Sequence, residues 1–179
     1  MRTKQLVLTA LFAALTAIGA FLKIQIPVEG IPAITLQFFF TAMAGVLLGA
    51  KYGAISQAVY VLLGLVGLPI FTMGGGFSYV LQPSFGFLVG LIPSAWVIGT
   101  LCKNAKSFWP MALGILAGLA VLYLIGTPYM GLILNLYLGK GMSVWQIVRA
   151  GCLLYLPGDV LKIVVCTALC LALRSRLPK

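Results

Sequence analysis

The side chains able to do chemistry are few in this sequence and lie far apart. There are two carboxylates, Glu29 and Asp159, against 12 lysines and arginines, and there is no histidine. A catalytic dyad, a serine–histidine pair or a metal site needs such groups close together, and the glycine pattern of a phosphate-binding loop is also missing. The inventory argues against an enzyme and against a resident metal or cofactor. A protein with no visible energy source must be passive or borrow energy from a partner.

One charged pair stands out near the C-terminus. Asp159 and Lys162 are three residues apart, follow Leu156-Pro157-Gly158, and share a helical stripe with Tyr155 and Cys166. Because proline suits the first helical position, we expect acid, base and phenol on one face of the opening turns of a helix. An acid there could simply stabilise the helix end in a solvated ion pair. A binding role is favoured, because a charge beside an apolar run is costly in lipid.

A second candidate region, residues 74–90, mixes glycines, aromatic residues and uncharged polar side chains. Such a mixture can close on a small ligand, because glycine permits close backbone approach, aromatic rings form apolar walls and polar tips orient a head group. The candidate contacts are Phe77, Ser78, Tyr79, Gln82 and Phe85. Taken singly, Tyr79 could equally be an anchor at the membrane surface, and Gly86 and Gly90 could be helix-packing positions.

The composition identifies the kind of protein that must position these residues. Hydrophobic residues make up 62% of the chain and the mean hydropathy is +1.14, which excludes a soluble domain. Long apolar runs favour helices over a barrel, so we predict an all-α membrane protein whose residues 1–179 form a single membrane domain. The net charge of +10 comes from scattered basic residues, which argues against nucleic-acid binding. The four cysteines lie mostly in apolar runs and are interpreted as packing residues.

Apolar runs between glycine, proline and charged residues predict six membrane helices. Their expected ranges are 6–23, 36–50, 53–69, 84–102, 108–134 and 154–174. With the N-terminus inside, eight basic residues fall on the cytoplasmic side and four on the outer side, so both termini are expected in the cytoplasm. Three long outer connections, 24–35, 70–83 and 135–153, then suggest a ligand vestibule, although they could also be tolerated insertions.

Three motifs in order resemble one family. They are Pro32, Thr35 and Gln37; Pro-Ser-Phe-Gly-Phe-Leu-Val-Gly at 83–90; and Pro157-Gly158-Asp159-x-x-Lys162. Together, over nearly the whole chain, they resemble the BioY family, the biotin-specific S components of energy-coupling-factor (ECF) transporters. Ala33 and Ser84 depart from the usual proline and threonine without removing a candidate ligand contact.

The resemblance implies a six-helix S-component bundle that binds biotin near the outer face, covered by the first and third outer connections. It implies that Asp159 accepts the ureido N–H groups of biotin and that Lys162 meets the ureido oxygen or the carboxylate, with Gln82 or Tyr79 completing the hydrogen bonds. The residues assigned to the site are Gln37, Ser78, Tyr79, Gln82, Phe85, Tyr155, Asp159 and Lys162.

The resemblance also implies partners. Ala10 and Ala14, and Ala13 and Ala17, recur at four-residue spacing on the first helix, and such a small-residue face lets helices approach closely. In the family this face docks on a transmembrane coupling subunit driven by two cytoplasmic ATPases, in the plasma membrane of prokaryotes. Ordinary packing within the bundle is an equal alternative for the alanines. For the protein, the alternatives are an S component or facilitator for another small vitamin, or a structural membrane subunit.

Overall fold

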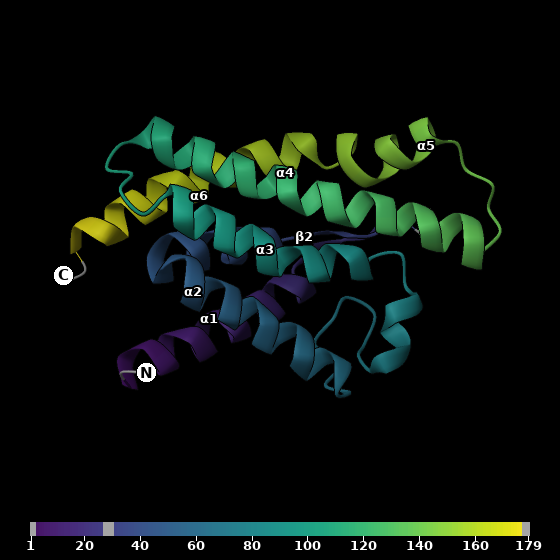
Figure 1. Ribbon diagram of the computed structural model, residues 1–179, viewed down its shortest axis with the longest axis horizontal. Helices are drawn as coiled ribbons and strands as arrows, with labels where there is room; N and C mark the ends of the chain where they lie inside the picture. Colours follow the sequence, from purple (N-terminus) through teal and green to yellow (C-terminus); the bar gives the residue numbers. More distant parts are fainter. Residues whose placement is uncertain (1–2, 27–30, 177–179) are drawn as a thin grey trace.

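The computed structural model describes residues 3–26 and 31–176, with the side chains of 175 and 176 excepted. Pro27, Glu29 and Gly30, on which part of the sequence analysis falls, lie outside the described residues. The chain is a bundle of helices whose first and last helices, α1 (Thr3–Phe21) and α6 (Leu156–Arg176), bring both ends of the chain to the same end of the molecule (Figure 1). Within the described residues, four helical stretches are long and apolar enough to cross a membrane: Thr3–Phe21, Gln37–Leu65, Phe108–Tyr137 and Val144–Arg174.

The long element α2 (Gln37–Leu65) is a helical hairpin rather than one straight helix. Gly49 has φ +80° and ψ 175°, a combination that breaks a helix and that essentially only glycine adopts. A Cβ on Gly53 would lie 2.9 Å from the Cα of Gly45, whereas eight residues of straight helix would separate them by about 12 Å. The two arms, 37–48 and 50–65, therefore run antiparallel. The expected helices 36–50 and 53–69 placed this reversal at residues 51–52, which is wrong by two residues because Gly49 supplies the required backbone angles.

The remaining helices agree with the expected apolar runs to within a few residues. They are α3 (Phe85–Leu101) and α4 (Phe108–Leu132), and α4 continues into a π-helical turn at Ile133–Tyr137. The expected connection 135–153 contains the short helix α5 (Val144–Val148) and a second π-helical turn, Arg149–Leu153. The first connection carries the antiparallel strands β1 (Lys23–Ile24) and β2 (Ile34–Thr35), which the sequence did not predict.

Arg174 fastens the helix ends beside the termini. Its guanidinium donates to the carbonyls of Cys102 (2.8 Å) and Ala105 (3.1 Å), just after α3, and to that of Val46 (2.8 Å) near the end of the first α2 arm. A cation at helix C-termini satisfies carbonyls that have no partner within their own helix. The described parts of the long connections 24–35 and 70–83 lie away from this end of the bundle (Figure 1).

Candidate functional site

A cavity lies among the helices, and its lining includes Asp159 and Lys162. Its walls come from the starts of α2, α3 and α6, from the second half of α4 and from two connections. The lining residues are Pro32, Ala33, Thr35, Gln37, Phe38, Thr72, Tyr79, Ser84, Phe87, Leu88, Leu91, Leu122, Tyr123, Tyr155, Asp159 and Lys162.

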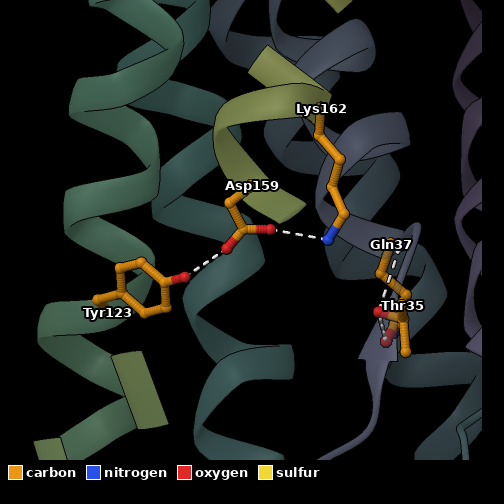
Figure 2. A network of polar contacts seen from close by, with 5 residues as sticks. All are labelled: Thr35, Gln37, Tyr123, Asp159 and Lys162. Carbon is orange, nitrogen blue, oxygen red and sulfur yellow. Dashed lines mark hydrogen bonds and ion pairs between the residues drawn. The ribbon is translucent and has the colours of Figure 1, made fainter. Parts of the chain in front are cut away.

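The charged pair of α6 faces this cavity. Asp159 is 5% exposed, and its Oδ1 lies 2.7 Å from the Nζ of Lys162. Its other oxygen accepts a hydrogen bond from the hydroxyl of Tyr123 on α4 (Figure 2). Both carboxylate oxygens therefore have protein partners, which reduces the large cost of burying a charge in an apolar bundle.

The opening turn of α6 carries Asp159 at the cavity wall. Pro157 and Gly158 lie in the opening turn of α6, and Asp159 is the acid of that turn. The backbone N–H of Asp159 donates to the carbonyl of Tyr155 at 2.9 Å, so this turn is a regular helical one. The hydroxyl of Tyr155 donates to the carbonyl of Pro32, which ties the start of α6 to the first connection.

A second polar group lies at the junction of β2 and α2. Thr35 Oγ1 donates to Gln37 Oε1 at 3.0 Å, and Gln37 Nε2 donates to the Tyr60 hydroxyl at 2.8 Å. Tyr60, on the second arm of the hairpin, donates in turn to the carbonyl of Ile70 at 3.0 Å. In the view of Figure 2, Lys162 lies between Asp159 and the Thr35–Gln37 pair.

A third polar group comes from the connection between α2 and α3. The Tyr79 hydroxyl lies 2.8 Å from Thr72 Oγ1 and accepts from Ser84 Oγ at 3.1 Å. Phe71 anchors this connection: it is 1% exposed, packs against Tyr79 with ring centroids 4.6 Å apart, and occupies the space that a Cβ on Gly64 would fill. Lys23 of β1 donates to the carbonyl of Thr72 and so joins the first two connections.

Five of the eight residues assigned to the site from the sequence line the cavity: Gln37, Tyr79, Tyr155, Asp159 and Lys162. Ser78 and Gln82 instead line a separate hollow with Tyr137, and Phe85 packs against Tyr129 with ring centroids 5.9 Å apart. The connection between α2 and α3 lines the cavity through Thr72 and Tyr79. None of residues 135–153 is among the lining residues, so the structure does not show the expected cover by that connection.

Tyr123, Thr72 and Ser84 were not assigned to the site from the sequence. A phenol inside the apolar run 108–134 is the signal that could have drawn attention to Tyr123, because a buried tyrosine hydroxyl needs a partner. Thr72 and Ser84 reach the cavity only through the folding of their connection. Their spacing in the sequence gives no sign that they line the cavity.

The alanines of α1 divide between two environments. Ala10 and Ala14 are exposed on the outward side of the helix, Ala13 is 5% exposed inside the bundle, and Ala17 is half-buried against the core. Only Ala10 and Ala14 form part of a surface that another helix could reach.

The site and the fold together define a class: a helical membrane protein with a cavity for a small molecule that has polar groups and an apolar body. Polar groups stand at three places around walls formed by Phe38, Phe87, Leu88, Leu91 and Leu122. Within residues 3–26 and 31–176, no cluster of three potential metal ligands occurs. The arrangement is suited to holding a molecule by directed hydrogen bonds rather than to transforming it.

The chain belongs to the BioY family, whose family model matches residues 1–179. It is 44% identical over 177 residues to a probable biotin transporter BioY of Lysinibacillus sphaericus, covering 98% of this chain and 84% of that protein. It is 36% identical over 174 residues to the biotin transporter BioY of Thermotoga maritima, covering 96% of each. The fold is similar to the 2.1 Å crystal structure of the S-component for biotin from an ECF-type ABC transporter, with a TM-score of 0.84, 28% identity, and 97% and 92% of the two chains covered.

Proposed function

We propose that this protein is the biotin-binding S component of an ECF-type vitamin transporter. The observation that carries the proposal is the buried Asp159, held by Lys162 and Tyr123 at the wall of a cavity that is otherwise largely apolar. Family membership and the similarity to the biotin S-component support the same ligand. The chain captures the vitamin and performs no reaction on it.

The chemistry of biotin fits these groups. Its ureido ring offers two N–H donors and one carbonyl, its thiolane ring is apolar, and its side chain ends in a carboxylate. An ionised carboxylate has about four lone-pair sites, so Asp159 can accept a ureido N–H while keeping Tyr123 and Lys162. The ammonium of Lys162 has three donors and gives one to Asp159, which leaves donors for the ureido oxygen or the carboxylate. Matched buried hydrogen bonds of this kind reject analogues that lack those groups.

The proposal includes an arrangement in the plasma membrane. Counting the two arms of α2 separately gives six spans, with both termini in the cytoplasm and the cavity opening toward the outside. The eight-to-four distribution of basic residues supports this orientation. A transmembrane coupling subunit with two cytoplasmic ATPases supplies the energy for delivery, and the exposed Ala10 and Ala14 of α1 are its docking face.

Titration of the purified protein with biotin in detergent tests the function. We expect nanomolar affinity that falls by at least a hundredfold in Asp159→Asn, because the amide turns an acceptor-only group into one that also donates. Asparagine and aspartate have nearly the same size, so the loss cannot come from empty space left by the substitution. Tight binding of another small heterocycle with weak binding of biotin would instead assign a different vitamin, and binding of none would leave a structural subunit.

A further inference from the structure

A second polar cluster, buried in the bundle and outside the cavity, joins α1 to the α2 hairpin. It consists of Thr16 on α1, Thr41 on the first arm, and Ser56 and Gln57 on the second arm, each 0% exposed. Gln57 uses its whole amide: Oε1 accepts from Thr41 at 2.9 Å, and Nε2 donates to Thr16 at 3.2 Å and to Ser56 at 3.0 Å. The proposed binding of biotin uses none of these four side chains.

The contact between α1 and α2 also includes a backbone hydrogen bond at the C-terminal end of α1, from the Leu36 N–H to the Gly19 carbonyl at 3.1 Å. Gly19 brings the two elements close at the same point, since a Cβ there would lie 2.9 Å from the backbone of Leu36. Both contacts lie at the end of α1, whereas Gln57 bonds Thr16 further toward its middle. Smooth contacts between small and apolar residues have similar energies at several rotations, because lipid competes equally for apolar side chains. A directed hydrogen bond, by contrast, is lost when the helix rotates away from its partner. Buried polar residues are best attested as devices that select one register among several.

We infer that Gln57 sets the rotational position of α1, and with it the face that α1 turns outward. Successive residues of a helix are about 100° apart, so rotation by one residue would carry Thr16 away from Gln57. The same rotation would turn Ala10 and Ala14 out of their exposed positions. Gln57 is therefore a positioning residue: it touches neither the cavity nor the outward surface, yet it determines which surface is presented.

The outward face can be measured without biotin or any partner. Nitroxide labels placed singly at Ala10, Leu11, Ala14 and Ile18, all exposed in the structure, report collisions with oxygen dissolved in the bilayer. With Gln57 intact, we expect all four labels to be accessible. In Gln57→Leu, we expect the direction of maximal accessibility to turn about the helix axis, so that at least one label loses accessibility severalfold. An unchanged pattern overturns the inference.

Two further variants make the test specific. Thr16→Val removes the same contact from the α1 side while keeping the shape, and it must cause the same turn even if Gln57→Leu fails to fold. The double variant of Thr16→Val and Gln57→Leu must turn the accessibility pattern little further than either single variant, because both changes remove the same interaction. Ser94→Ala removes an equally buried bond, from Ser94 to the Gly118 carbonyl at 2.8 Å, and must leave the pattern of α1 unchanged.

The inference and the proposed function can fail separately. We expect biotin affinity within about threefold of the unmodified protein in Gln57→Leu and Thr16→Val, because neither residue lines the cavity. If the direction of maximal label accessibility turns but biotin does not bind, the positioning role of Gln57 is supported and the proposed ligand is refuted. If affinity and thermal stability fall together while the label pattern is unchanged, Gln57 supports the fold only and the inference is refuted.

Discussion

The hydroxyl of Tyr123 offers the sharpest test of how the cavity works. In Tyr123→Phe the ring remains, but one oxygen of the Asp159 carboxylate loses its donor while the other keeps Lys162. A hydrogen bond to a charged group contributes about 1.5–3 kcal/mol, and the freed carboxylate can turn toward Lys162 and away from a ligand. We expect binding to weaken by about 1.4 kcal/mol, which is tenfold in Kd, and by less than in Asp159→Asn.

Isothermal titration calorimetry with biotin in detergent measures this difference. Tyr137→Phe is the matched control: Tyr137 is 59% exposed and lies outside the cavity, so its loss should leave the Kd within twofold. An unchanged or tighter Kd in Tyr123→Phe, beside a large loss in Asp159→Asn, would refute the claim that Tyr123 orients the acid. A loss that appears equally in Tyr137→Phe would indicate a general effect on folding.

Two other predictions concern the backbone and the outward surface. Gly49→Ala should lower the free energy of unfolding in detergent by about 1–3 kcal/mol, because φ +80° strains any residue other than glycine. Steric crowding does not contribute, since no atom lies within 4 Å of the new Cβ. Gly158→Ala, which is in a helix and equally uncrowded, should leave the free energy of unfolding unchanged. Leucine at both Ala10 and Ala14 should abolish copurification of the proposed coupling subunit while biotin affinity is kept. Leucine at the exposed Ala168 of α6 should leave both copurification and biotin affinity unchanged, and copurification that survives leucine at Ala10 and Ala14 would rule out this docking face.

The long helices could be predicted from the sequence because their apolar runs are long and are bounded by glycine, proline or charged residues. It misplaced the reversal in α2, since Gly49 is one of 21 glycines and nothing local separates a reversing glycine from one that packs helices. The strands β1 and β2 are two residues each and are held by tertiary contact. A pattern of alternation needs more residues than that to be visible.

The candidate site was predictable where its geometry is local. Asp159, Lys162 and Tyr155 follow from helical spacing within a few residues of Pro157, and all three line the cavity. Tyr123 reaches Asp159 across 36 residues of chain, a pairing that spacing cannot reveal. Ser78 precedes Tyr79 in a short 3-10 turn, Phe77–Leu81, and Gln82 follows the end of that turn in extended backbone. Of the three, only Tyr79 lines the cavity. Composition therefore identified the right segment but could not select its inward-facing member.

The pairing of Asp159 with Lys162 has an electrical consequence for uptake. The two charges cancel, so an empty pocket contributes no net charge, whereas a pocket holding biotin as its carboxylate anion carries one negative charge. In a cell that is negative inside, each 100 mV of membrane potential opposes the inward passage of that charge by about 2.3 kcal/mol. Voltage alone would oppose uptake of the loaded vitamin, so its accumulation inside needs a source of energy, which is the role of the proposed ATP-driven partner.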